Sequence, residues 1–296
     1  MHMRMKRVAA LAAAAALAFA VGACGDSADS DSGSSGTSDV TFEAGTTMEK
    51  LNKAGKITVG TKFDQPLFGL KGLDGKPAGF DVEIAKIIAK GLGISADKIE
   101  FVETPSTVRE QVIQDGKVDI VAATYTINDK RKQVIDFAGP YYLAGQTILV
   151  KASDSSITGP DSFKDGTKKV CSVTNSTPAT NIKTYLKDET TQLVLFDVYS
   201  KCLDALKNDQ VNAITTDNVI LTGYMSTNEG QYKLAGTPFT EEPYGIGLKK
   251  GDDKFREFIN KTLEASFADG SYAKAWADTA GKYDKNAPKT PTINRY

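Results

Sequence analysis

The pattern of hydrophobic and polar positions predicts strands that alternate with helices. Ile84, Ile87 and Ile88 fall on one helical face, and Asp81 is suited to N-cap this helix. Short apolar runs between such helices are typical of strands, and a run without polar residues is typical of a strand covered on both faces. The first half of the chain is therefore predicted to hold strands at 56–62, 99–104 and 118–124 and helices at 80–93 and 107–116.

The same pattern begins again after residue 152. The stretches "VIQDGKVDIVAAT" and "DALKNDQVNAITTD" share a helix end, a turn and an apolar strand, and aligning Val118 with Val211 places Thr124 opposite Asp217. Ligands of α/β sheets bind at the carboxyl ends of strands, so two such units suggest a site between two lobes. Chance similarity of two βα units is the alternative. This second series is predicted to hold strands at 168–174, 193–198 and 211–216 and helices at 177–188 and 199–210.

Two extended, aromatic-rich segments, 140–152 and 237–251, flank the second series. They indicate that the chain crosses into a second lobe and later returns. Residues 252–283 are typical of two amphipathic helices that break at Asp269–Gly270 and pack on the first lobe. We therefore expect an α/β fold of two lobes, with lobe 1 formed by residues 46–146 and 241–296 and lobe 2 by residues 147–240.

The N-terminal residues have the layout of an export signal. Basic residues precede an Ala/Leu/Phe-rich run at 8–21, which is shorter than the roughly 20 residues that a spanning helix needs. "VGAC" resembles a bacterial lipobox, so residues 1–23 are predicted to be a lipoprotein signal peptide and Cys24 the lipidated mature N-terminus. An ordinary cleavage site is the alternative. Residues 24–45 are predicted to be a flexible tether, because 25–39 lack large apolar residues.

The few cysteines and the single histidine limit which metal sites and catalytic groups the chain can form. With Cys24 lipidated, two of the three cysteines remain, Cys171 and Cys202, and an even remainder in an exported chain fits one disulfide. Two buried free thiols are the alternative. The single histidine, His2, lies in the predicted signal. We therefore expect no zinc site, no other metal or cofactor, and no histidine-dependent catalytic triad in the mature chain.

The charge balance excludes one class of partner. The formal net charge is −1, with acidic and basic residues interspersed. A basic patch of the kind that nucleic-acid binding requires does not occur in the sequence. We therefore expect no nucleic-acid partner.

Several motifs occur in the order seen in one protein family: "ITVGTKFDQPLFG", "DGKPAGFDVEIAKIIAKGLG" and "GKVDIVAATYTINDKRKQVIDFAGPYYLAG". They resemble the polar amino-acid-binding proteins of ABC importers, solute-binding family 3, over nearly all of the predicted mature chain. The stretches "SVTNSTPA" and "TTDNVILTGY" and the placement of the two cysteines are most similar to actinobacterial glutamate-binding lipoproteins.

This resemblance implies a fold, a function and partners. The fold would be the type II periplasmic-binding-protein fold, with the two crossovers as its hinge. The protein would be a monomeric, extracytoplasmic binding protein without enzymatic activity, anchored to the cell membrane by its lipid. It would close on a polar amino acid, L-glutamate before aspartate or glutamine, and deliver it to ABC permease subunits.

The resemblance also assigns roles to residues. Arg131 matches the family arginine that holds the ligand α-carboxylate, and a planar guanidinium suits a carboxylate bidentately. Asp217 matches the acid that pairs with the α-ammonium. Thr124, Thr126, Ser176 and Thr177 match neighbouring ligand contacts, the last two in a loop that opens a helix. Taken alone, an arginine or aspartate after a strand is more often a surface charge or a cap.

Side-chain recognition is expected after the first strand. This chain has "KFDQPLFG" where many family members have an aromatic-rich segment. Lys62 could bind a side-chain carboxylate and Phe63 could form a pocket wall; an exposed strand-end lysine is the alternative. Tyr244 and Trp276 are interpreted as packing residues.

Two other functional classes remain. Some proteins of this fold are cyclohexadienyl dehydratases, which need a general acid or base in the cleft. The acids predicted in the cleft already have a charge-pairing role, and the mature chain has no histidine that could act as a general acid or base there. A sensor domain that serves a signalling partner is the third class, and the chain carries no kinase or channel segment.

Overall fold

The computed structural model describes residues 40–285 and 287–296. The predicted signal peptide, the lipidation site Cys24 and most of the predicted tether lie outside these residues. None of the helices that the structure describes is long and apolar enough to cross a membrane.

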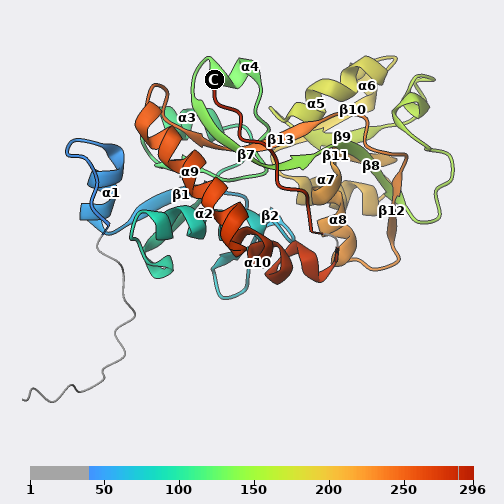
Figure 1. The fold of residues 1–296 in the computed structure, drawn as a ribbon. Coiled ribbons are helices and arrows are strands. Elements are labelled where there is room, and N and C mark those ends of the chain that lie inside the picture. The colour runs from blue at the N-terminus through green and yellow to red at the C-terminus, as the bar shows by residue number, and fades with distance from the viewer. Residues whose placement is uncertain (1–39, 286) are drawn as a thin grey trace, which may run out of the picture. The chain divides into compact units, whose positions relative to one another are not determined.

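The first sheet has five strands in the order β5-β1-β6-β13-β7. Three of them, β1, β7 and β13, are labelled in Figure 1. β1 pairs in parallel with β5 and β6, whereas β13 is antiparallel to β6 and β7. We call this sheet and the helices packed on it the first lobe. Its strands are β1 (Ile57–Thr61), β5 (Ile99–Glu103), β6 (Ile120–Val121), β7 (Asp136–Ala144) and β13 (Glu242–Leu248), and its helices are α1 (Thr47–Ala54), α2 (Phe80–Gly91), α3 (Arg109–Gln114), α4 (Asp129–Lys132), α9 (Asp253–Asp269) and α10 (Ser271–Asp278).

The second sheet also has five strands, in the order β10-β9-β11-β8-β12. β9 is parallel to β10 and β11, and β8 is antiparallel to β11 and β12. This sheet and its helices form the second lobe. Its strands are β8 (Gln146–Lys151), β9 (Val170–Val173), β10 (Leu193–Phe196), β11 (Ala213–Asp217) and β12 (Tyr232–Ala235), and its helices are α5 (Thr177–Asn181), α6 (Glu189–Gln192), α7 (Tyr199–Lys207) and α8 (Asn218–Ser226).

The chain passes between the lobes twice, and the two crossovers lie against each other. The first is at Gly145, between β7 and β8, and the second precedes β13. A Cβ atom on Gly145 would lie 2.7 Å from the carbonyl oxygen of Thr240, so only glycine fits this approach. The backbone N–H of Gln146 donates to the hydroxyl of Thr240 at 3.0 Å. The predicted α/β fold of two lobes with two crossovers is thus confirmed, while the residue boundaries of the lobes stay a prediction.

A third, small sheet joins β1 to α2 and was not predicted. It consists of β2 (Asp64–Gln65), β3 (Gly69–Lys71) and β4 (Pro77–Ala78). We call residues 64–78 the flap. Although it belongs to the first lobe by sequence, β2 contacts α7 and α8 of the second lobe.

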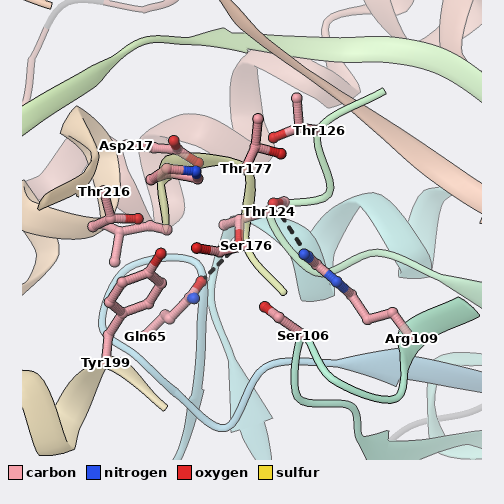
Figure 2. A pocket seen from close by; sticks show the side chains of 12 residues that line it. Gln65, Ser106, Arg109, Thr124, Thr126, Ser176, Thr177, Tyr199, Thr216 and Asp217 are labelled. Atoms are coloured by element: carbon pink, nitrogen blue, oxygen red, sulfur yellow. Dashed lines mark hydrogen bonds between the residues drawn. The ribbon is translucent and has the colours of Figure 1, made fainter. Parts of the chain in front are cut away.

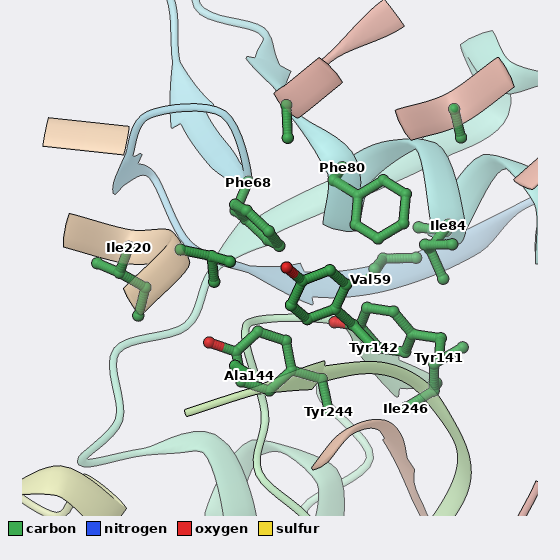
Figure 3. Close-up of a cluster of buried hydrophobic side chains, with 14 of the residues drawn as sticks. Val59, Phe68, Phe80, Ile84, Tyr141, Tyr142, Ala144, Ile220, Tyr244 and Ile246 are labelled. Carbon is green, nitrogen blue, oxygen red and sulfur yellow. The ribbon is translucent and has the colours of Figure 1, made fainter. Parts of the chain in front are cut away.

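An aromatic cluster forms the centre of the first lobe's core (Figure 3). The ring of Phe68 lies edge-on to Phe80 and Tyr142, with centroids 5.8 Å apart in each case. Trp276 of α10 stacks on Tyr142 at 5.6 Å and meets Phe80 at 5.3 Å. Each ring adds buried apolar area and edge-to-face attraction, so α10 is held firmly on the first lobe. This agrees with the packing role expected of Trp276.

The structure corrects two local predictions. Asp81 does not cap α2, because Gly79 occupies the N-cap; Asp81 is buried and accepts hydrogen bonds from the Tyr141 hydroxyl at 2.6 Å and the Thr124 N–H at 2.7 Å. The strand predicted at 118–124 pairs only over Ile120–Val121. The chain turns at Thr124, whose φ is 45°, and this turn brings the following residues to the site.

Candidate functional site

A polar cavity lies between residues of the two lobes (Figure 2). Five of the predicted site residues, Thr124, Thr126, Ser176, Thr177 and Asp217, line it together. Sequence reasoning missed the other residues of the lining, which are Gln65, Ser106, Arg109, Pro178, Tyr199, Thr216 and Ile220.

The strand order explains why these residues meet. Asp217 ends β11, Ser176 follows β9, and Thr124 follows β6. These three strands belong to the parallel parts of the two sheets. The carboxyl ends of the strands therefore converge on one cleft, as is usual in α/β folds. Ser106 and Arg109 follow β5 and could have been found by the same rule.

Arg131 connects the lobes beside the cavity. Its side chain is buried, with 6% of its surface exposed. Nη1 donates to the carbonyl of Thr126 at 2.7 Å and to the hydroxyl of Thr177 at 3.0 Å, and Nη2 donates to the carbonyl of Asn175 at 3.3 Å. Nε donates to Glu110 at 3.0 Å. Arg131 thus reaches the cavity through Thr126 and Thr177 and is not itself among the lining residues.

Asp217 is a buried acid with one free oxygen. Its Oδ2 accepts a hydrogen bond from the Tyr244 hydroxyl at 2.6 Å, whereas Oδ1 accepts none from the part of the chain that the structure describes. Burial, together with repulsion from Glu242, raises the pKa of Asp217 to about 7. A cation beside Oδ1 would restore the charged carboxylate. Tyr244, interpreted from sequence as packing, also orients this acid.

Glu242 is a second buried acid that sequence reasoning missed. It begins β13 and accepts hydrogen bonds from the Asn181 amide at 3.1 Å and the Thr240 hydroxyl at 3.0 Å. Burial raises its pKa, against the opposing effect of the Thr126 hydroxyl. Glu242 is not among the lining residues, but its charge acts on the lining acid Asp217 and raises the pKa of Asp217.

Two buried basic residues, Lys62 and Arg109, follow β1 and β5. Lys62 is 4% exposed and donates to the hydroxyl of Ser106 at 3.0 Å. Burial lowers the pKa of Lys62 well below its usual value, and the nearby Arg109 lowers it further. Lys62 itself is not among the lining residues, and the ring of Phe63 lies 5.0 Å from the ammonium of Lys71, also outside the lining.

Arg109 is a cationic residue of the cavity lining. Its guanidinium stacks on Tyr125 at 4.2 Å, and Nη1 donates to the carbonyl of Ala123 at 2.9 Å. Its Nε is buried without a hydrogen-bond partner in the described residues. Within these residues neither Arg109 nor Lys62 has an acidic group within ion-pair distance. Buried charges are normally paired, so this arrangement favours an anionic ligand group.

Ser176 and Thr177 line the cavity at the start of helix α5 in the second lobe. The hydroxyl of Ser176 accepts the N–H of Ala179 at 3.1 Å and so caps α5. Cys171 and Cys202 form a disulfide, as predicted, which ties β9 to α7. This bridge supports the loop that carries Ser176 and Thr177 and the helix that carries Tyr199. Among the described residues no cluster of His, Cys, Asp and Glu is suited to hold a metal ion.

Two relatives named for the amino acid that they bind are similar to this chain in sequence. The glutamate-binding protein GluB of Corynebacterium efficiens is 39% identical over 249 residues, which are 81% of this chain and 84% of the relative. The ABC transporter glutamine-binding protein GlnH of Bacillus subtilis is 40% identical over 227 residues, 76% of this chain and 81% of the relative.

Solved structures agree with this fold. An ancestral arginine-binding protein bound to glutamine has a TM-score of 0.70 and 37% identity, covering 77% of this chain and 98% of its own. A solute receptor for L-cysteine from Neisseria gonorrhoeae has a TM-score of 0.74 and 30% identity, covering 81% and 97%. Residues 57–278 match the family described as bacterial extracellular solute-binding proteins, family 3, and the chain belongs to that family.

Proposed function

We propose that this chain is the extracytoplasmic binding protein of an ABC importer and that it binds L-glutamate between its two lobes. The observation that carries this proposal is the pairing of opposite charges across one cavity. Arg131 lies at one side, and the unpartnered oxygen of Asp217 lies at another. A zwitterionic amino acid would supply the partner that Asp217 Oδ1 lacks, and a carboxylate for the guanidinium of Arg131.

The α-carboxylate would bind at Arg131. The hydroxyl of Thr177 and the carbonyl of Asn175 now accept hydrogen bonds from its guanidinium, and a carboxylate is the stronger acceptor because it is charged. Thr126 and Thr177 would add hydroxyl contacts. The α-ammonium would donate to Oδ1 of Asp217. Both charges would then be paired in a site with little water, which avoids the cost of burying either one alone.

The ligand side chain would reach the basic residues after β1 and β5. Lys62 donates a hydrogen bond to the Ser106 hydroxyl, and Arg109 lies close enough that its charge lowers the pKa of Lys62. Such a group favours a carboxylate over an amide or a cation. The names of the relatives include both glutamate and glutamine binding, and this excess of cations supports glutamate.

Delivery of the amino acid to the permease would depend on closure of the two lobes and on the lipid anchor at the N-terminus. The two crossovers at Gly145 and before β13 would act as the hinge, and ligand contacts from both lobes would favour closure. Lipid attached to Cys24 would hold the protein, a monomer, at the outer face of the membrane, near ABC permease subunits. Mass spectrometry of the mature protein from its native membrane tests the lipid: an unmodified N-terminus would rule out the anchor.

Ligand binding is tested by a thermal-shift screen of the twenty amino acids, followed by calorimetry. A ligand that binds only the folded state raises the melting temperature. We expect the largest shift with L-glutamate and its loss in Arg131→Ala, while the control Arg295→Ala, which removes an exposed arginine paired with Glu257 and Glu264, keeps it. Undiminished glutamate binding by Arg131→Ala would refute the site, and the absence of any shift would refute the function.

We propose a binding protein and not an enzyme. One solved relative, 29% identical with a TM-score of 0.71, is an ancestral amino-acid-binding protein described as a precursor of cyclohexadienyl dehydratase. The cavity acids here have charge-pairing roles, which supports binding. Turnover of prephenate or arogenate by the purified protein would contradict this proposal. A sensor role would be indicated if no permease and ATPase genes neighbour the gene of this protein.

A further inference from the structure

The N-terminus of α7 lacks a cap from its own lobe. Val198 occupies the N-cap position and has no hydroxyl, amide or carboxylate with which to accept a backbone hydrogen bond. The first N–H groups of a helix have no partner within the helix and need one from elsewhere. A carboxylate is a strong partner there, because it also interacts favourably with the helix dipole.

Asp64, on the flap of the first lobe, supplies this partner across the lobe boundary. Its Oδ2 accepts the N–H of Tyr199 at 2.9 Å and the N–H of Ser200 at 3.2 Å. The hydroxyl of Tyr224, on α8, donates to the Asp64 carbonyl at 2.9 Å and lies 3.3 Å from the same carboxylate oxygen. One residue of the first lobe thus connects two helices of the second.

The backbone of the flap also approaches α8 closely. A Cβ atom placed on Gly223 would lie 2.3 Å from the carbonyl oxygen of Pro66, which is closer than atoms can approach. Glycine at this helical position therefore permits the contact. Asp64 and Gly223 together define a surface on which the flap fits the second lobe.

The contact is coupled to the cavity through Tyr199. Its N–H is held by Asp64, and its side chain lines the cavity beside Gln65, the residue that follows Asp64 (Figure 2). Asp64 is not among the lining residues, and its Oδ2 already accepts the N–H groups of Tyr199 and Ser200. Its effect on binding must act through the arrangement of the lobes and of Tyr199.

We propose that Asp64 is an interlobe latch: it caps α7 only when the lobes are closed, and so favours the closed state and positions Tyr199 against the ligand. This inference rests on the proposed hinge closure around an amino acid. It predicts that Asp64 controls how long a ligand is held without contacting it.

The test compares three variants with a matched control. Asp64→Ala removes the cap, whereas Asp64→Asn keeps an acceptor at the same place and removes only the charge. Gly223→Ala blocks the approach of the flap while improving the helix propensity of α8. The control, Asp188→Ala, removes a cap within the second lobe, since Asp188 accepts the N–H of Thr190 at 2.9 Å.

Closure is measured by energy transfer between dyes on cysteines introduced at exposed Lys98 and Ser153, one on each lobe, and by the dissociation rate of L-glutamate. In Asp64→Ala the ratio of closed to open protein should fall by between about 3-fold and 30-fold, with dissociation faster by a similar factor. Asp64→Asn should stay within about 3-fold of wild type, because asparagine is nearly as good an N-cap. Gly223→Ala should open the protein without lowering its melting temperature.

Asp188→Ala should lower the melting temperature and leave dissociation unchanged. A wild-type dissociation rate and closed ratio in Asp64→Ala, or equal behaviour of Asp64→Ala and Asp188→Ala, would overturn the latch. If Asp64→Ala fails to fold, Gly223→Ala decides, and a wild-type closed ratio there would overturn the proposal. If no amino acid changes the energy transfer in wild type, the proposed function fails, and the closed ratios without ligand still decide on the latch.

Discussion

Glu110 and Arg131 form an ion pair in which Oε1 of the acid lies 3.0 Å from Nε of the guanidinium. The two side chains come from the separate short helices α3 and α4, and only 19% and 7% of their respective surfaces are exposed. Burial and the nearby Arg109 lower the pKa of Arg131, and Glu110 opposes this effect. Glu110 therefore orients the guanidinium and stabilises its charge before any ligand arrives.

Replacing Glu110 separates these two effects. Glu110→Gln keeps an oxygen that can accept from Nε, so we expect glutamate affinity within about 3-fold of wild type. Glu110→Ala removes the acceptor, and loss of a hydrogen bond to a charged group costs about 1.5–3 kcal/mol, so affinity should fall by at least about tenfold. Calorimetry of both variants measures this. Equal affinities of the two variants would show that Glu110 does not orient Arg131.

The raised pKa of Asp217 predicts that binding depends on pH. The ammonium of a ligand pairs with the charged carboxylate, so binding must expel a proton from Asp217 below its pKa of about 7. Affinity should therefore be constant above pH 7 and fall by up to about tenfold per pH unit below it. Calorimetry near pH 5.5 and near pH 8, in buffers of different ionisation enthalpy, should detect about one released proton at the lower pH only.

Two variants control this measurement. Asp217→Asn should bind weakly at every pH and release no proton. Glu242→Gln removes the repulsion that helps raise the pKa of Asp217, so the decline in affinity should begin at a lower pH. The raised pKa of Asp217 also affects folding stability, and this dependence on pH is opposite to that of ligand affinity. The folded protein binds the Asp217 proton more tightly than the unfolded chain does. The free energy of unfolding therefore decreases as pH rises from about 4 to about 7. A flat affinity profile in wild type would contradict the assignment of Asp217.

Arg109 should discriminate between a side-chain carboxylate and an amide. Its Nε is buried without a partner in the described residues, and its guanidinium lines the cavity. In Arg109→Gln we expect the affinity for L-glutamate to fall by about 30-fold or more, since truncating a buried charge pair costs about 2–5 kcal/mol, while glutamine binding changes much less. Competition calorimetry with both amino acids gives the ratio. A parallel loss of both affinities would instead place Arg109 at the α-carboxylate.

The disulfide should contribute a large part of the stability of the second lobe. Cys171 and Cys202 are 31 residues apart in sequence, and closing a loop of this length stabilises the fold by about 3–4 kcal/mol in the chain-entropy view. The double variant Cys171→Ala/Cys202→Ala should unfold at a lower denaturant concentration. Wild type treated with reductant is the control and should unfold at the same concentration as the variant. No effect of reductant on wild type would indicate free thiols.

The sequence was informative about the fold because the patterns are local. Hydrophobic period and glycine positions predict the α/β alternation, and the break at Asp269–Gly270 appears where α9 ends and α10 begins. These signals need only the spacing of neighbouring residues. The strand at 118–124 was predicted too long, since its end is set by a turn at Thr124 and by the hydrogen bond that the Thr124 N–H donates to Asp81, which is 43 residues away.

For the candidate site, the sequence by itself determined which residue types follow the strands, and the family resemblance gave them roles. It brought out Thr124, Thr126, Ser176, Thr177 and Asp217, which share the cavity. Only the tertiary structure decided that Gln65, Arg109 and Glu242 lie near them, that Arg131 already has four partners, and that Asp64 caps a helix of the other lobe. The physical reason is that burial, pKa shifts and interlobe hydrogen bonds depend on groups far apart in the chain, whose proximity no local pattern records.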